Sequence, residues 1–442
     1  MQTTDGMHMV ESRPDSPSTS DTAAGRLADL QLTARTAAGR QFVELAERHA
    51  EDFAARAEQH DVEGSFPFQN FKEMAQSSFL AGTVGAEYGG LGVDSLYDVM
   101  VGLSRLARGD ASTAIAANMH VAGASVAGQF MRRSLAEGDE HTAAMLSALL
   151  GQVGSGAVVM CFPTTERGTD LTAPQMEATP ADGGYVLNGR KIFGTISPAA
   201  QLFFPSVRIP KDGGGYLTGT AMVPGDAPGL VVEDNWDSLG MRASGSNDIT
   251  FTDVRVPASH VFAVKDNYAK VGQGFATFAL TANIPLIATF LGVAECATAH
   301  AAEAAGKRKG PRKRRLADRI PIQQLMAEIE IDLATCRAML ARVGQLADEF
   351  LARYETGDPL SAESNALMKE TQCMKYVVNR KSIEVVDRAM IICGGGSYMS
   401  RHPLARLYRD VRAGPFMQPF APYEALEYIG KVSLGLDPAL DR

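Results

Sequence analysis

Residues 239–257 read LGMRASGSNDITFTDVRVP. The first part is a loop rich in glycine and serine, and the second part, NDITFTDVRV, is short and rich in β-branched and aromatic residues. That composition, ended by Pro257, is typical of a β-strand. The stretch therefore predicts a loop followed by the strand on which a β domain ends.

Five earlier segments have a similar composition and are separated by clusters of glycine and proline. They read GAVVMCF, GYVLNGRKIFG, QLFFPSVRI, LTGTAMV and GLVVED. Short strands at such regular intervals indicate a compact antiparallel β domain. We predict that this domain spans residues 156–265.

Helical patterns lie on both sides of the β domain. In FVELAERHAEDFAARAEQH the apolar residues Phe42, Leu45 and Ala46 recur at helical spacing, which predicts a helical domain over residues 25–155. Long segments such as LMAEIEIDLATCRAMLARVGQLADEFLARY predict a helical bundle over residues 266–442. Residues 1–24, dominated by Ser, Thr, Asp and Pro, predict a disordered tail. The expected class is α+β.

The overall composition narrows the class of protein. The 442 residues are 45 % hydrophobic and 21 % charged, with a net charge of -9, which argues against a general nucleic-acid binder. We see no apolar run long enough to span a membrane and no secretory leader, so we expect a cytoplasmic protein. The five scattered cysteines and the widely spaced histidines predict neither a disulfide framework nor a metal site.

One run of positive charge stands out at KRKGPRKRR, residues 307–315, where seven of nine residues are basic. A solvated loop explains it equally well as a site for phosphate groups, where Arg312 and Arg315 would bind oxygens. The sequence leaves these two interpretations open.

Five strings, in this order, resemble the acyl-CoA dehydrogenase superfamily of flavoproteins. They read PFQNFKEMAQSSFLAGTVGAEYGGLGV, VVMCFPTTERGTD, LNGRKIFGT, LGMRASGSNDITFTDVRVP and ICGGGSYMSRHPLARLYRD. The resemblance covers nearly the whole chain after the tail. It implies a helical N-terminal domain, an antiparallel β domain and a C-terminal four-helix bundle, assembled as a homotetramer.

The resemblance also implies where a flavin binds. A flavin ring needs an apolar or aromatic surface on one face and hydrogen-bond donors along its polar edge. In place of the family's Trp-Ile-Thr/Ser triplet this chain has Phe193, Gly194 and Thr195, which keep an aromatic surface and a hydroxyl. The other residues that the resemblance assigns to the flavin are Phe162, Thr164, Thr165, Thr169, Gly394 and Gly395.

Two departures from the family pattern bear on the reaction. At the position of the glutamate that abstracts the substrate α-proton, this chain has Gln418, whose amide cannot remove a carbon-bound proton near neutral pH. The alternative position, within GFATFALTANIPLIATF, has no carboxylate, and Glu424 and Glu427 lie further along the chain. At the family's glutamine near the FAD adenosine stands Ile391, so FMN or a loosely held flavin from a separate reductase becomes an option beside FAD.

These departures match the flavin-dependent monooxygenases of the superfamily, in which reduced flavin and molecular oxygen form the oxidant. Such an enzyme needs a dry cavity over the flavin. Phe416, Met417 and Phe420 would supply apolar cover and bind substrate, while Gln418 and Thr195 would act in catalysis. The chain is similar to the nitrososynthases, which oxidise the amine of a nucleotide-linked deoxysugar, and Arg312 and Arg315 would then bind the diphosphate.

Two other functions stay open on the sequence. One is a dehydrogenase of acyl-CoA or acyl-carrier-protein substrates that uses a non-standard base. The other is a catalytically silent flavin-fold protein that acts as a binding partner.

Overall fold

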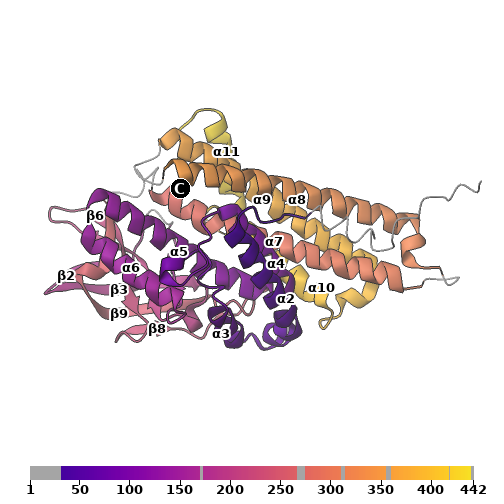
Figure 1. Cartoon of the computed structure of the whole chain (residues 1–442), viewed down its shortest axis with the longest axis horizontal. Helices are drawn as coiled ribbons and strands as arrows, with labels where there is room; N and C mark the ends of the chain where they lie inside the picture. The colour runs from indigo at the N-terminus through magenta and orange to yellow at the C-terminus, as the bar shows by residue number, and fades with distance from the viewer. Residues whose placement is uncertain are drawn as a thin grey trace, which may run out of the picture.

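A computed structural model describes residues 31–169, 173–265, 274–309, 314–354, 360–417 and 419–439. Helices come first along the chain, then a group of strands, then long helices (Figure 1). The predicted fold class, helical regions on either side of a β region, is therefore confirmed. The predicted tail over residues 1–24, Arg312 and Gln418 lie outside the described residues.

The N-terminal region begins where Thr36 caps a helix by accepting a hydrogen bond from the Gly39 amide. Glycines 82 and 102 lie against the Phe42 ring so closely that a Cβ on either would come within 2.5 Å of it. Phe42 also stacks on Phe79 at 4.4 Å, which fixes the first helix against its neighbours. The helices are α2 (Ala37–Glu63), α3 (Phe68–Gln76), α4 (Leu96–Gly109), α5 (Ala111–Glu137) and α6 (Glu140–Gly154).

The strands form a seven-stranded sheet, in the order β10-β6-β5-β2-β3-β9-β8, and a three-stranded sheet, β1-β4-β7. Most pairs are antiparallel as predicted, but β2–β5 and β1–β4 are parallel. The sequence does not reveal these two pairings because each joins strands separated by other elements. The strands are β1 (Met160–Cys161), β2 (Glu177–Ala181), β3 (Gly184–Gly194), β4 (Leu202–Phe203), β5 (Ser206–Pro210), β6 (Tyr216–Ala221), β7 (Val223–Pro224), β8 (Leu230–Val232), β9 (Asn247–Pro257) and β10 (Val261–Lys265).

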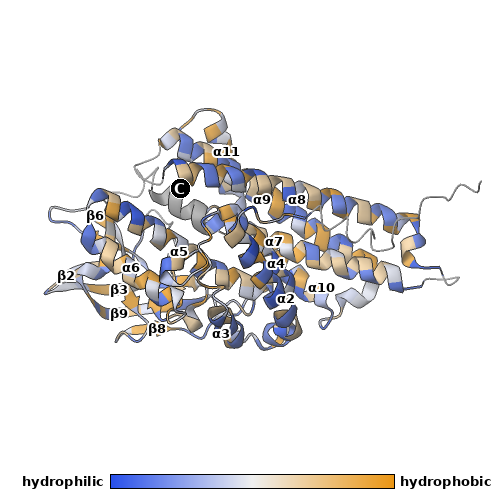
Figure 2. Ribbon diagram, viewed as in Figure 1, coloured by the Kyte–Doolittle hydropathy of each residue, from blue (hydrophilic) through white to orange (hydrophobic). Residues whose placement is uncertain are grey.

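The C-terminal region is dominated by three long helices, α7 (Gly274–Lys307), α8 (Ile320–Arg353) and α9 (Ser361–Cys393). Two shorter helices, α10 (Pro403–Val411) and α11 (Pro422–Ser433), follow them in the chain. Apolar and polar residues alternate along α8 and α9 (Figure 2), as expected of helices with one buried side. The part of α7 at Asn283–Lys307 is long and apolar enough to cross a membrane, which corrects our prediction that no run has that length. Its apolar window is 78 % buried within the protein, as befits the central helix of a bundle.

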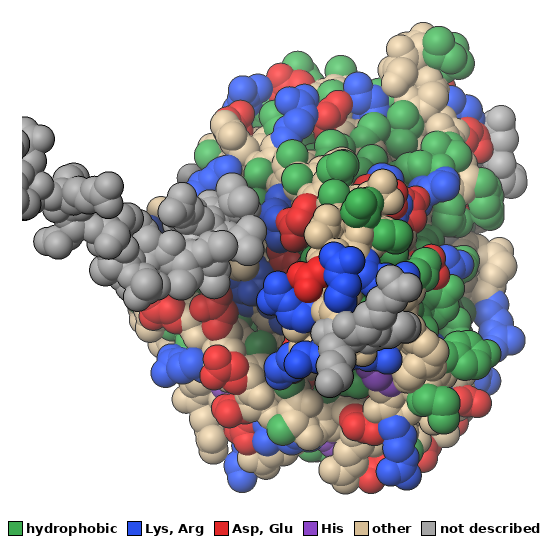
Figure 3. All heavy atoms as spheres, turned by 90° about the vertical axis from the view of Figure 1, so that its right-hand side faces the viewer, with side chains coloured by type: hydrophobic (Ala, Val, Ile, Leu, Met, Phe, Trp, Pro, Cys, Tyr) green, Lys and Arg blue, Asp and Glu red, His purple; other side chains and the backbone are tan. Residues whose placement is uncertain are grey.

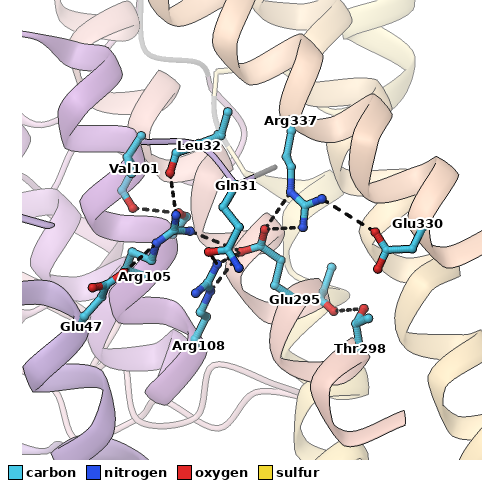
Figure 4. Close-up of polar contacts among 12 residues, drawn as sticks. Gln31, Leu32, Glu47, Val101, Arg105, Arg108, Glu295, Thr298, Glu330 and Arg337 are labelled. Carbon is cyan, nitrogen blue, oxygen red and sulfur yellow. Dashed lines mark hydrogen bonds and ion pairs between the residues drawn. The ribbon is translucent and has the colours of Figure 1, made fainter. Parts of the chain in front are cut away.

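A buried carboxylate joins the N-terminal helices to the bundle (Figure 4). Glu295 of α7 lies 2.7 Å from Arg108, 3.0 Å from Arg337 and 3.7 Å from Arg105. Arg105 and Arg108 belong to α4 and Arg337 to α8, so one side chain ties three helices together. Paired charges of this kind hold packed elements in one register.

Candidate active site

Two segments of the β region that the sequence assigns to flavin binding lie side by side. The Ile192 amide donates to the Thr165 carbonyl at 2.9 Å. Next to this bridge, Lys191 Nζ lies 3.0 Å from Glu166 Oε1, with both side chains buried. Burial lowers the pKa of Lys191 to about 8, against the opposing effect of the Glu166 charge. The ion pair therefore holds residues 162–165 against residues 193–195.

Phe193, the residue before the last in β3, has an unusual backbone conformation. Its φ is 56°, in the left-handed region that a bulky residue seldom adopts, and its side chain is 58 % exposed. The ring contacts Trp236 edge-on with centroids 6.0 Å apart. A strained, exposed aromatic near the end of a strand is typical of a binding site, where the ring can contact a ligand.

Thr195 begins a chain of three hydroxyl groups. Its Oγ1 lies 2.9 Å from Ser246 Oγ, which lies 2.7 Å from Ser244 Oγ. Ser244 and Ser246 are buried, whereas Thr195 is only half-buried. The chain fixes the direction of the Thr195 hydroxyl at the surface of the β region, beside Phe193.

The loop that carries Ser244 and Ser246 is fastened to α10. Asp410, which is 1 % exposed, accepts a hydrogen bond from the Met241 amide at 2.7 Å. Burial raises the pKa of Asp410 to about 6, and the Arg406 charge opposes that rise. Met241, like Phe193, has a positive φ, of 54°. The buried Asp410 carboxylate thus holds Met241 in its positive-φ conformation.

The side chains of the remaining β-region candidates are partly buried or hydrogen-bonded within the protein. The Phe162 ring stacks on Phe204 at 4.9 Å and lies where a Cβ on Gly123 would be 2.0 Å from it, so the ring belongs to the core. The Thr169 hydroxyl donates to the Ala173 carbonyl at 2.6 Å. Thr164 and Thr165 are half-buried beside Phe162.

The predicted apolar cover lies between α10 and α11. Phe416 ends the short helix η8 (Gly414–Phe416) and is 70 % exposed. Phe420 stacks on Tyr428 at 5.0 Å. Glu424, the nearest downstream carboxylate considered as a base, accepts a hydrogen bond from the Ala421 amide at 2.7 Å and so caps α11. This capping role agrees with our expectation that Glu424 is not the base that abstracts a proton.

The structure keeps the basic run apart from these residues. Arg308 Nη1 donates to the Cys393 carbonyl, next to Gly394, and Arg315 pairs with Asp318 at 2.9 Å. Arg308 directly follows α7, and Gly394 and Gly395 begin the short helix that follows α9, so these residues belong to the helical bundle. Basic side chains gather at this end of the bundle (Figure 3). Among the described residues, no hydrogen bond or ion pair joins Arg315, Gly394 or Gly395 to Thr195.

The sequence matches the acyl-CoA dehydrogenase N-terminal domain over residues 36–130, the middle domain over residues 161–254 and the C-terminal domain over residues 272–418. The chain belongs to the acyl-CoA dehydrogenase family. This confirms the family inferred from the five strings. The middle-domain match includes Phe162, Phe193, Thr195 and Ser246, and the C-terminal match ends at Gln418.

Several members of the acyl-CoA dehydrogenase family with high similarity to the chain are nitrososynthases. The amino sugar nitrososynthase DnmZ of Streptomyces peucetius is 35 % identical, over 93 % of this chain and 97 % of its own length. The L-evernosamine nitrososynthase of a Micromonospora species is 32 % identical, over 91 % and 92 %. The predicted resemblance to nitrososynthases is thereby confirmed.

Solved structures agree with this placement. KijD3, in complex with FMN and a dTDP-linked 3-amino-4-keto sugar, is 33 % identical over 92 % of this chain and 96 % of its own, with a TM-score of 0.83. A nitrososynthase from Micromonospora carbonacea var. africana is 31 % identical over 92 % and 100 %, with a TM-score of 0.82. Butyryl-CoA dehydrogenase of Megasphaera elsdenii, at 23 % identity and a TM-score of 0.76, shares the fold.

The sequence analysis missed one histidine with an unusual environment. His120 of α5 is fully buried, and its Nδ1 accepts a hydrogen bond from the Met160 amide at 3.0 Å. Its Nε2 has no hydrogen-bond partner among the described residues. Burial lowers the pKa of His120 to about 4, so the ring is neutral and Nε2 carries the proton. This environment depends on Met160 of β1, which lies 40 residues away along the chain, so the sequence alone does not reveal it.

Proposed function

We propose that this protein is a flavin-dependent N-oxygenase, which uses reduced flavin and molecular oxygen to oxidise the amino group of a nucleotide-linked deoxysugar. The observation that carries the proposal is the replacement of the family's catalytic glutamate by Gln418, with Glu424 engaged in capping α11. Abstraction of a substrate α-proton requires a general base, and neither Gln418 nor the engaged Glu424 supplies one. The similarity to nitrososynthases supports an amine as the group that is oxidised.

The residues of the β region fit a flavin. The exposed Phe193 ring offers a flat apolar surface, and the half-buried Thr195 hydroxyl stands beside it with a fixed direction. We assign the backbone of Phe162, Thr164 and Thr165, which the Glu166–Lys191 pair holds in place, to the polar edge of the ring. When bound, the reduced flavin supplies the electrons that activate oxygen.

The chain's own residues would perform the other tasks. Thr195, oriented by Ser246, would hold a proton at its Oγ1 and donate a hydrogen bond to the reacting group. Phe416, Met417 and Phe420 would exclude water from the substrate, and Gln418 would donate its amide hydrogens to the sugar. Excluding water matters because an oxygen-activating site that is wet releases hydrogen peroxide instead of oxidising its substrate.

The proposal also covers assembly and partners. We assign the flavin as FMN, because Ile391 replaces the glutamine that contacts the FAD adenosine in the family. A separate cytoplasmic reductase would deliver this flavin in reduced form. Tyr398 and Met399, 84 % and 65 % exposed at the basic end of the bundle, are suited to contact with another copy. In a homotetramer, we assign Arg312 and Arg315 of a neighbouring copy to the sugar diphosphate.

The test is a product assay with an acyl thioester comparison. The purified protein is supplied with FMN, a flavin reductase, oxygen and a dTDP-linked amino sugar, and products are identified by mass spectrometry. We expect a hydroxylamine or nitroso sugar. Bleaching of oxidised flavin by an acyl-CoA under anaerobic conditions would instead assign the protein as a dehydrogenase, and no turnover of either substrate would favour a silent binding protein.

A further inference from the structure

A buried lysine in the bundle faces the segment that precedes α11. Lys375 of α9 is only 4 % exposed. Its Nζ donates to the Met417 carbonyl and, at 2.5 Å, to the Phe420 carbonyl. One ammonium group thus bridges two backbone carbonyls on either side of residues 418 and 419. A backbone carbonyl outside helices and sheets needs a hydrogen-bond donor from a side chain or from water, and Lys375 supplies that donor to both carbonyls.

A second side chain on the same face of α9 holds the beginning of this segment. Asn379, one helical turn beyond Lys375, is 2 % exposed and donates to the Gly414 carbonyl at 2.8 Å. Gly414 lies so close that a Cβ on it would be 2.7 Å from Asn379 Oδ1. Gly414, Met417 and Phe420 are therefore each held to α9 by a polar side chain.

The choice of lysine at this position is informative because burial of an ammonium group is unfavourable. Burial lowers the pKa of Lys375 to about 8, and the Glu424 charge only partly offsets the effect. Methionine or leucine would fill the same volume in an apolar bundle without this cost. Because the buried ammonium group is unfavourable, we infer that its hydrogen bonds to the Met417 and Phe420 carbonyls are needed.

We propose that Lys375 is a positioning residue for N-oxygenation, which sets the conformation of the segment bearing Phe416, Met417 and Phe420. The inference rests on the proposed function, because that function places this segment over the substrate. Lys375 takes no part in bond formation. It keeps the apolar side chains in a single arrangement, so that water stays away from the substrate and the oxidant reacts with the amine.

The test compares Lys375→Met with Lys369→Met, a control on the same helix whose lysine is partly exposed and pairs loosely with Glu370 at 3.5 Å. Two quantities are measured in the full-length protein: hydrogen exchange of the amides in residues 412–421, and the fraction of oxygen released as hydrogen peroxide. We expect Lys375→Met to speed the exchange about tenfold, the effect of losing a charged hydrogen bond, and to raise the peroxide fraction several-fold. FMN affinity should be equal in both variants.

The outcomes separate this inference from the proposed function. Exchange equal to that of the control overturns the inference, and so does faster exchange with an unchanged peroxide fraction. If the wild-type protein forms no N-oxygenated product, the proposed function fails, while the exchange comparison still decides whether Lys375 fixes the segment. If Lys375→Met does not fold, Lys375→Gln, which keeps an uncharged donor group, and Asn379→Ala provide the comparison.

Discussion

Backbone strain in this protein is concentrated around the residues assigned to the flavin. Among the described residues, five that are not glycine have positive φ, and three of them are Phe193, Ile196 and Met241. All three lie in the two segments that meet at the Thr195–Ser246 hydrogen bond. Strain of this kind persists only where surrounding contacts enforce it, and here those contacts include the buried Asp410 and the Ser244–Ser246 pair.

The hydroxyl of Thr195 provides a residue-level test. Thr195→Ala removes one oriented donor from the reacting centre, so we expect the turnover of the amino sugar to fall about 100-fold with little change in thermal stability. Thr195→Ser keeps the hydroxyl and should retain most of the activity. The measurement is steady-state product formation for both variants. Equal losses in Thr195→Ala and Thr195→Ser would contradict a role for the hydroxyl.

The raised pKa of Asp410 predicts how stability depends on pH. Its pKa is about 6 in the folded protein, above the ordinary value of 3.8, so the folded state binds the proton more tightly than the unfolded state. The stability contributed by the protonated carboxyl is complete below pH 4 and is lost as the pH rises through 6. Up to about 3 kcal/mol is involved.

Asp410→Asn should remove this dependence while its amide oxygen still accepts the Met241 N–H bond. We therefore expect the variant to unfold like the wild type near pH 4 and at a higher temperature than the wild type at pH 7. Thermal unfolding at the two pH values measures the difference. A variant that loses stability equally at both would show that the charged form of Asp410 is the one the fold requires.

At this scale the sequence allows part of the site to be predicted. Phe193 and Thr195 could be assigned because they lie in a recognisable string. The partners that orient them could not: Lys191 lies 25 residues after Glu166 and Asp410 lies 169 residues from Met241. Lys375 sits in a helix with other charged residues, and nothing in its neighbours distinguishes it from a surface lysine.

Elements pack around α7, and a single ion network sets their register. Glu295→Gln would leave Arg105, Arg108 and Arg337 beside a neutral group (Figure 4). Loss of one partner of a buried network is costly, so we expect a decrease of about 3 kcal/mol in the free energy of unfolding. Chemical denaturation measures it, and Glu330→Gln, which removes an exposed carboxylate 3.9 Å from Arg337, serves as the control. Equal effects of the two substitutions would contradict a central role for Glu295.

The elements themselves were largely predictable, because helices and strands here differ clearly in composition. The long helices follow from their apolar periodicity and the strands from β-branched segments between glycines. The parallel pairs β1–β4 and β2–β5 were not predictable, since the pairing of strands depends on packing between elements distant in the chain. The apolar length of α7 could be read from the sequence, whereas the burial of 78 % of its apolar window depends on packing in the bundle.

At the scale of the molecule, the candidate residues fall in two parts of the fold, Phe193 and Thr195 in the β region and Arg315 and Gly394 in the bundle. The separation predicts that several chains contribute to one site, and we expect the protein to be a homotetramer in solution. Light scattering coupled to size-exclusion chromatography gives the mass directly. A monomer with full N-oxygenase activity would show that Arg315 and Gly394 take no part in the reaction.

The central claim is that oxygen, rather than proton abstraction by a carboxylate, performs the chemistry in this member of the family. It is tested most directly by turnover with reduced FMN, a dTDP-linked amino sugar and isotopically labelled oxygen gas. Our account predicts that the labelled atom appears on the sugar nitrogen. Oxidation of the sugar without label, or consumption of oxygen solely to labelled hydrogen peroxide under all substrate concentrations, would contradict it.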